Sequence, residues 1–70
     1  MNRTPVTSKM VTSVGYDPDT TTLEVVFNHG GTYQYYEVSA TKYADLMEAD
    51  SIGHFVREHI MDKHPFKKIE

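Results

Sequence analysis

Three tyrosines close together in the middle of the chain are the side chains that could most directly recognise a ligand. Tyr33, Tyr35 and Tyr36 lie in the segment TYQYYEV, whose composition is typical of a strand. Aromatic rings on a strand can stack against unpaired nucleic-acid bases, at about 1–3 kcal/mol per base. They can equally pack against the core or against a neighbouring strand. A nucleic-acid site would also need cations, for which the candidates are Lys9, Arg57, Lys63, Lys67 and Lys68, together with Arg3.

The histidines do not have the spacing of a metal site. His54, His59 and His64 follow one another at intervals of five residues. On a helix, five residues turn through about 500°, so neighbouring side chains point about 140° apart and do not converge on one ion. Because the chain has no cysteine, thiolate metal sites, disulfides and cysteine nucleophiles are excluded as well. The sequence therefore predicts no metal site and no cofactor.

No group of residues has the pattern of a catalytic site. None of the serines lies in a nucleophile elbow. Gly30-Gly31 lies between two expected strands rather than before a helix, so it lacks the helix N-terminus that a phosphate-binding loop requires. A chain of 70 residues has room for one core and little for a closed catalytic cavity. We therefore expect one domain over residues 1–70, with an ordered core at about 7–69 and no enzymatic activity.

The chain is acidic overall and basic towards its two ends. Its net charge is −3, which argues against strong non-specific binding to nucleic acids because such binding depends on neutralising phosphates. The segment 16–50 carries seven acidic residues and one lysine. The N-terminal segment has no apolar signal region, and no apolar run approaches the length of a membrane span. We expect a cytoplasmic protein that does not contact a membrane.

Three segments are typical of antiparallel strands, namely residues 9–16, 22–28 and 32–38. Asp17-Pro18-Asp19-Thr20 separates the first two and has the residues of a type I turn. Asn28-His29-Gly30-Gly31 separates the second from the third, and its glycines allow a tight hairpin turn. The expected sheet is a three-stranded antiparallel meander.

The length of the second turn decides which tyrosines face the core. A three-residue loop, Asn28-His29-Gly30, places Tyr33 and Tyr35 on the apolar face of the preceding strand. A loop with an even number of residues places Tyr36 and Val38 there instead, because a shift by one residue exchanges the two faces. We favour the three-residue loop. In either case at least one tyrosine lies on the opposite face.

Two short helices are expected after the strands. Ser39 is a suitable N-cap for a helix over residues 40–49. A second helix begins at Asp50 or Ser51 and ends before His64-Pro65, because the residue before a proline disfavours helical geometry. The fold class is therefore α+β, a three-stranded antiparallel meander followed by two short helices packed on one face. In the segment after the second helix, we expect Phe66 to dock on the core.

Several short motifs follow one another along almost the whole chain, namely Val14-Gly15-Tyr16-Asp17, Leu23-Glu24-Val25-Val26-Phe27, Gly30-Gly31-Thr32-Tyr33-Gln34-Tyr35, Val38, Ser51-Ile52-Gly53-His54-Phe55, Ile60 and His64-Pro65-Phe66. Their order and spacing resemble the KTSC domain family. The family's module has about this size and occurs at the C-terminus of some lysyl-tRNA synthetases and as stand-alone bacterial and phage proteins. The association with a tRNA enzyme implies RNA binding for a family whose function is not established.

Two functions follow as alternatives. In the first, a non-catalytic module binds single-stranded RNA or tRNA weakly through its tyrosine-bearing sheet face and its basic ends, with an affinity that falls steeply with salt. In the second, the chain is a protein–protein interaction or self-association module without nucleic-acid binding. That module would use an edge strand or an exposed apolar strip, and the acidic face of the first helix would favour a basic partner.

Overall fold

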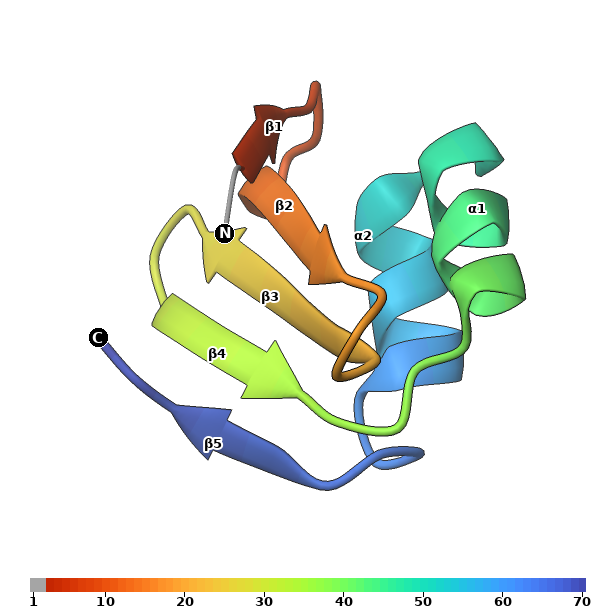
Figure 1. Cartoon of the computed structure of the whole chain (residues 1–70). Coiled ribbons are helices and arrows are strands. Elements are labelled where there is room, and N and C mark those ends of the chain that lie inside the picture. The colour runs from red at the N-terminus through yellow and green to blue at the C-terminus, as the bar shows by residue number, and fades with distance from the viewer. Residues whose placement is uncertain (1–2) are drawn as a thin grey trace.

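The computed structural model describes residues 3–70, which form an antiparallel sheet of five strands and a helical layer. The strands lie side by side in the order of the sequence (Figure 1). Their bounds are β1 (Arg3–Pro5), β2 (Val11–Asp17), β3 (Thr22–Phe27), β4 (Gly31–Tyr35) and β5 (Phe66–Lys68). The predicted α+β class is confirmed, whereas the prediction of three strands is wrong, because a further strand is added at each edge of the meander.

The two added strands are short and depend on their neighbours. β1 pairs with β2 and β5 pairs with β4, through three residue pairs each. β1 lies before residue 7, where the core was expected to begin, and β5 lies in the segment expected to follow the second helix. Three residues are too few to show an alternation of apolar and polar side chains. These segments are therefore strands because a partner strand lies beside them.

The turn between β3 and β4 has three residues, as we expected. Phe27 pairs with Gly31 and Val25 pairs with Tyr33. Gly31 has a φ of 84°, a conformation that favours glycine. Tyr33 and Tyr35 therefore lie on the same face as the apolar residues of β3, and the alternative with an even-numbered loop does not occur.

A bulge in β2 adds a second valine to the core. The pairing with β3 shifts between Val11 and Ser13, so that Thr12 is the extra residue. Val11 and Val14 are both buried, although strict alternation would place them on opposite faces. The bulge brings both side chains to the face that the helices cover.

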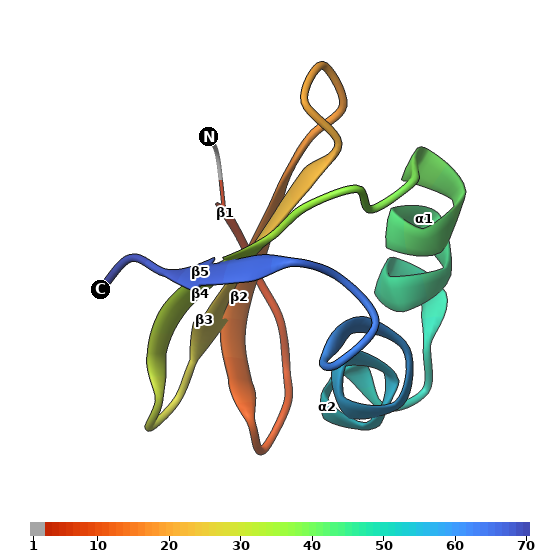
Figure 2. The same cartoon turned by 90° about the horizontal axis from the view of Figure 1, so that it is seen from below.

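The helical layer covers one face of the sheet (Figure 2). It consists of α1 (Ala40–Glu48), α2 (Ile52–Phe55) and one π-helical turn, η1 (Val56–Ile60). Ser39 and Ser51 are the N-caps of α1 and α2, and each hydroxyl accepts a hydrogen bond from a backbone N–H in the first turn. The buried apolar residues between the two layers are Val11, Val14, Leu23, Val25, Tyr35, Val38, Leu46, Ile52, Val56 and Ile60.

The second helical segment ends earlier than the proline predicts. η1 ends at Ile60, and the chain then turns through Asp62, whose φ is 66°. Residues 61–64 form this turn, which returns the chain to the sheet as β5. Within residues 3–70, the helices are all too short or too polar to cross a membrane.

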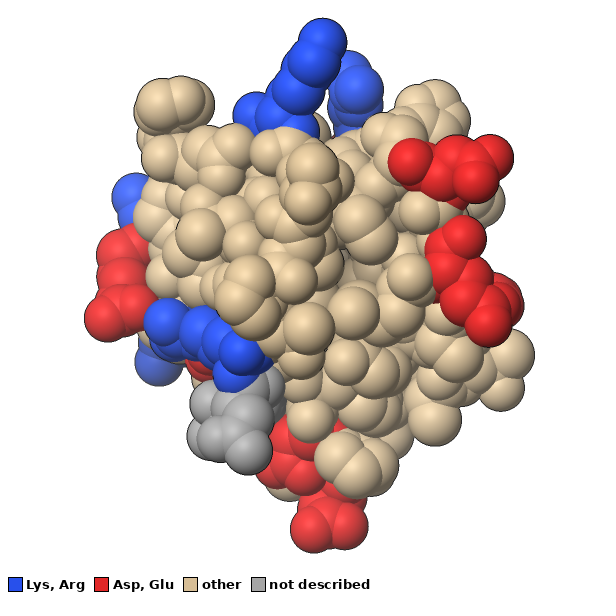
Figure 3. Space-filling model, turned by 90° about the horizontal axis from the view of Figure 1, so that it is seen from above, with Lys and Arg blue, Asp and Glu red and all other residues tan. Residues whose placement is uncertain are grey.

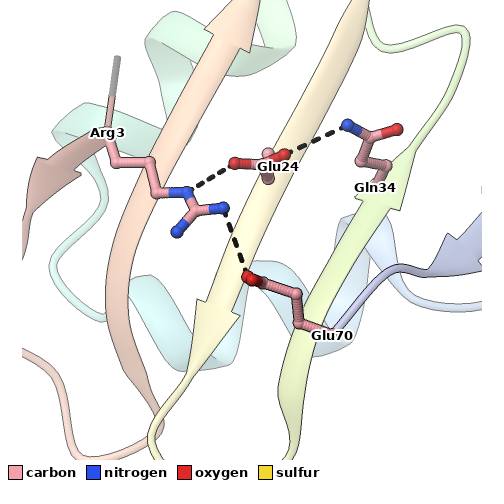
Figure 4. A network of polar contacts seen from close by, with 4 residues as sticks. All are labelled: Arg3, Glu24, Gln34 and Glu70. Carbon is pink, nitrogen blue, oxygen red and sulfur yellow. Dashed lines mark hydrogen bonds and ion pairs between the residues drawn. The ribbon is translucent and has the colours of Figure 1, made fainter. Parts of the chain in front are cut away.

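The face of the sheet away from the helices is closed by a polar network (Figure 4). Arg3 on β1 donates a hydrogen bond to Glu24 on β3 at 2.5 Å, and its guanidinium lies 3.5 Å from the carboxylate of Glu70. Gln34 on β4 donates to the second carboxylate oxygen of Glu24 at 3.0 Å. Glu24 is only 5% exposed in consequence. Arg3 thus links the first edge of the sheet to its centre and to the residues that follow the last strand.

Candidate functional site

An open apolar cleft of about 490 Å³ lies on the helix side of the sheet. Strands and the turns beside them supply its apolar side chains, so the cleft is built mainly by the sheet. We call it the aromatic–methionine cleft, after the six apolar residues that line it, namely Met10, Phe27, Tyr33, Tyr35, Met61 and Phe66.

The four aromatic rings of the cleft form one continuous wall. The rings of Phe27 and Tyr33 meet edge to face, with centroids 5.7 Å apart. Tyr33 and Tyr35 lie nearly parallel at 6.2 Å, and the ring of Phe66 is 5.9 Å from each of them. Such contacts between aromatic rings stabilise their arrangement. The wall is therefore formed before any ligand arrives.

Strand pairing explains how this wall is built. Because Val25 pairs with Tyr33, the tyrosine side chain must lie on the helix side of the sheet. Tyr35 pairs in turn with Phe66 on β5, which brings the phenylalanine onto the same face. We expected Phe66 to dock on the core, but this prediction is wrong. The side chain is 58% exposed at the border of the cleft. The short pairing of β5 with β4 holds it there.

Two methionines complete the cleft from outside the strands. Met10 comes directly before β2, and Met61 comes directly after η1. Met61 has an extended backbone, with φ −63° and ψ 137°, so that the chain leaves the helix at this residue. Methionine side chains are flexible and polarisable and adapt to ligands of different shape. The cleft thus combines a rigid aromatic wall with an adaptable methionine side.

Few charged groups surround the cleft. Lys9, His29 and Asp62 contribute to its lining. Burial, together with the nearby Tyr33 and Asp62, raises the pKa of the Tyr35 hydroxyl above its usual value, so Tyr35 remains neutral. Among residues 3–70, no group of three or more histidines and acidic residues is placed to hold a metal ion. The arrangement is suited to taking up apolar groups, with tyrosine hydroxyls as hydrogen-bonding partners.

The predicted nucleic-acid residues lie on two different faces of the sheet. Tyr33, Tyr35 and Lys9 line the aromatic–methionine cleft, and Lys68 pairs with Tyr33 and so faces the same side. Tyr36 lies elsewhere, because its hydroxyl donates to Gln34 in the polar network on the opposite face. Lys67 pairs with Gln34 and faces that side too. One tyrosine does lie away from the apolar face of β3, as the sequence predicts.

The remaining predicted cations do not join the cleft. Arg57 is exposed on η1 and lines, with Lys9, a separate and more polar hollow of about 630 Å³. Lys63 is exposed in the turn after η1, and Arg3 is already paired with two carboxylates. In the view of Figure 3, blue and red side chains lie mainly around the margin, with acidic groups on the side of α1. The described basic residues therefore do not form one continuous patch.

Sequence reasoning identified only Tyr33 and Tyr35 among the six apolar residues that line the cleft. Phe66 was expected to dock on the core, and Met10, Phe27 and Met61 were not among the predicted site residues. Met10 directly precedes a strand, and Met61 and Phe66 flank the turn at His64-Pro65. In the sequence analysis, however, Met10 lies inside the expected strand 9–16 and Met61 lies inside the expected second helix, so no sequence signal marked either side chain as part of a cleft.

Comparison with protein families and with known proteins gives a consistent result. The family model of the KTSC domain matches residues 7–64. A relative from Tsukamurella paurometabola, named only "Protein", is 44% identical over 52 residues, which are 74% of this chain and 78% of the relative. An uncharacterised protein from Stutzerimonas stutzeri is 36% identical over 64 residues, 91% of this chain and 90% of the other.

The fold also matches a crystal structure. A KTSC domain protein from Yersinia pestis superimposes with a TM-score of 0.97 at 40% sequence identity. The match covers 99% of this chain and 97% of the Yersinia chain. The whole described arrangement, with both edge strands, therefore has a close counterpart in a solved structure.

Proposed function

The chain belongs to the KTSC domain family, and from this premise we propose that it is a non-catalytic module whose aromatic–methionine cleft binds apolar side chains of a partner protein. The observation that carries the proposal is the cleft itself, in which six apolar side chains border an opening of about 490 Å³. Clefts of this volume with mostly apolar walls and a few polar groups are common ligand sites.

The exposure of the cleft supports a protein partner. Phe66 leaves 58% of its surface open to solvent, although burial of such a ring would be favourable. Exposed apolar patches rimmed by polar groups mark interaction sites on protein surfaces. Met10 and Met61 add the adaptable contacts that help a surface bind side chains of varied shape. A partner that buries Phe66 and fills the cleft would gain from both effects.

Weak binding of single-stranded RNA is the other function that the sequence predicts. Stacking requires a ring face that a base can reach. Tyr35 is only 3% exposed, and Tyr33 already contacts the rings on either side of it. Tyr36 and Lys67 lie on the other face of the sheet, so the predicted residues cannot contact one strand of bases together. These observations favour a protein partner over RNA.

An amide-correlation NMR titration tests the proposal directly. The labelled full chain is titrated with a panel of short synthetic peptides, each with one Phe, Leu or Met in a Ser/Thr background, and separately with a mixed-sequence single-stranded RNA at low and physiological salt. We expect the peptides to shift the amides of residues 33–35, 61–64 and 66. RNA shifts at Tyr33 and Tyr35 that persist at physiological salt would support the nucleic-acid function instead.

Two exposed apolar residues offer a matched pair of variants for the same titration. Phe66→Ser removes part of the cleft wall, whereas Ile69→Ser removes an apolar side chain that is 38% exposed and does not line the cleft. We expect Phe66→Ser to weaken peptide binding about tenfold and Ile69→Ser to change it by less than about twofold. Equal effects of the two variants would show that the cleft is not the binding site.

A further inference from the structure

The outer edge of β5 is an open edge of the sheet next to the aromatic–methionine cleft. All three residues of β5 are exposed, and β5 is the last strand in the order of the sheet. The other edge, β1, contains Pro5, which lacks a backbone N–H. A further strand could therefore bond more completely to β5 than to β1.

The hydrogen bonds between β4 and β5 show which backbone groups face the open edge. The N–H of Tyr36 donates to the carbonyl of Pro65 at 2.8 Å, and the N–H of Ile69 donates to the carbonyl of Thr32 at 2.8 Å. In an antiparallel ladder, successive residues bond alternately to one side and to the other. The odd-numbered residues of the segment 65–69 therefore bond towards β4, and the even-numbered residues direct their N–H and C=O groups outwards.

The side chains of β5 indicate the charge of a partner strand. Lys67 and Lys68 are both exposed, and they lie on opposite faces of the sheet because they pair with Gln34 and Tyr33. Opposite charges on neighbouring strands attract, and like charges directly opposite one another are destabilising. Two copies of β5 paired over their full length would place Lys67 against Lys67 of the second copy. The edge thus disfavours its own copy and favours an acidic strand.

Phe66 connects this edge with the cleft. Its side chain lies on the helix side of the sheet, in contact with the rings of Tyr33 and Tyr35. A residue placed beside Phe66 on an added strand would point to the same face. An apolar side chain at that position would cover the exposed part of the ring and reach the opening of the cleft.

We propose that β5 binds an extended segment of a partner protein as a sixth strand, with an apolar side chain beside Phe66 and acidic side chains beside Lys67 and Lys68. Main-chain hydrogen bonds to the outward groups of Phe66 and Lys68 hold the segment, and the side chains select it. This inference rests on the proposed function, to which it adds the mode of binding and the chemistry of the partner.

The first experiment selects ligands without assuming their sequence. Random nine-residue peptides displayed on phage are selected on the immobilised full chain, and the strongest binder is synthesised. We expect the selected peptides to combine apolar residues with neighbouring Asp or Glu. Selected peptides that are basic would overturn the acidic-partner inference, and a failure to enrich any peptide would overturn this inference and the proposed function together.

The second experiment tests whether the peptide binds as a strand. Single N-methyl groups are placed in turn at each position of the synthetic peptide, which removes one backbone donor at a time. In the central part of the peptide, N-methylation at every second position should weaken binding about tenfold, because the N–H groups at these positions point towards β5. N-methylation at the positions between them should change binding less than about threefold. If methylation shows no such alternation and Phe66→Ser still weakens binding, strand addition is wrong and the proposed function stands.

A charge reversal on the protein tests the partner's chemistry. Lys67→Glu should weaken binding of the selected peptide about fivefold, because it replaces an attraction by a repulsion. Arg57→Glu makes the same change of charge at an exposed residue of η1 that does not line the cleft, and it should change binding by less than about twofold. Unchanged or stronger binding by Lys67→Glu would overturn the inference that the partner strand is acidic.

Discussion

Replacement of Gly31 by alanine tests the turn that places the tyrosines in the cleft wall. Gly31 has a φ of 84°, which an alanine adopts only with backbone strain of about 1–2 kcal/mol. A Cβ at this position would also lie 2.3 Å from the backbone carbonyl oxygen of Glu70. The substitution therefore strains the turn and displaces the segment after β5.

The displacement adds a second cost. To reach an ordinary contact, the carbonyl of Glu70 must move by about 1 Å, which breaks its hydrogen bond from the N–H of Thr32 at 3.1 Å. The loss of one such bond destabilises a protein by about 0.5–1.5 kcal/mol. Together with the strain at Gly31, we expect a loss of about 2–3 kcal/mol in the free energy of unfolding, or about 10–20 °C in Tm for a chain of this size.

The neighbouring glycine supplies the control. A Cβ at Gly30 would meet Phe27 at 3.5 Å, an ordinary contact, and Gly30 does not have a positive φ. Gly30→Ala should therefore change the free energy of unfolding by no more than about 0.5 kcal/mol. Both variants are compared by urea and thermal unfolding followed by circular dichroism. If Gly31→Ala costs no more than Gly30→Ala, the turn does not impose the backbone conformation on which the reasoning depends.

Three further predictions concern polar groups of the fold. Burial raises the pKa of Glu24, but the hydrogen bonds that this carboxylate accepts outweigh the effect of burial and hold the pKa below 4.5. The ionised carboxylate therefore stabilises the fold above pH 4.5, and this stabilisation is lost as the pH falls below that value. Urea midpoints measured against pH should show this acid step in the native chain and a smaller one in Glu24→Gln. Burial and a neighbouring lysine lower the pKa of His64 below 6.5, so the free energy of unfolding should also fall as the pH drops below 6.5. If a pH series on His64→Gln showed the same fall, the assignment of this fall to His64 would be wrong. The hydroxyl of Tyr16 donates a hydrogen bond to the carbonyl of Val38 at 2.6 Å. Because Tyr16→Phe leaves that carbonyl without its partner, the substitution should lower the free energy of unfolding in urea by about 1–2 kcal/mol. A loss below about 0.3 kcal/mol would show that water replaces the hydroxyl.

The central strands and their register were predictable because local rules determine them. The alternation of side chains identified the segments near β2, β3 and β4. The three-residue turn at Asn28-His29-Gly30 then determined that Tyr33 and Tyr35 face the helices, and the pairing of Phe27 with Gly31 confirms it. Ser39 caps the first helix as expected, because a hydroxyl at this position pairs with the free N–H groups of the first turn. The second helix was expected to begin at Asp50 or Ser51, and Ser51 is its N-cap.

The edge strands were not predictable from their own residues. β1 and β5 contain three residues each, and Pro5 and the two lysines of β5 are typical of exposed segments rather than of strands. Their pairing arises when β2 and β4 present free edges and the chain returns beside them. For the same reason, the contact of Phe66 with Tyr35 could not be predicted, since it exists only through the pairing of β5.

The candidate site was predictable in part. Tyr33 and Tyr35 were identified by residue type and do line a cleft. The place of Met61 depends on where η1 ends, and η1 ends at Ile60 rather than directly before His64-Pro65. A prediction that extends the helix by one turn points this side chain in another direction. The aromatic–methionine cleft therefore became visible only with the tertiary structure.

The contact between Arg3 and Glu70 brings together two residues that are far apart in the sequence. Their side chains lie 3.5 Å apart, although the segment from Arg3 to Glu70 contains 68 residues (70 − 3 + 1). The conformational entropy that a cross-link removes from an unfolded chain increases with the number of residues it encloses, so a bond at this position would restrict almost the entire chain. The contact lies on the face of the sheet opposite to Tyr33 and Tyr35. A cross-link between side chains at these two positions would therefore raise the resistance of the fold to heat and leave the aromatic–methionine cleft open.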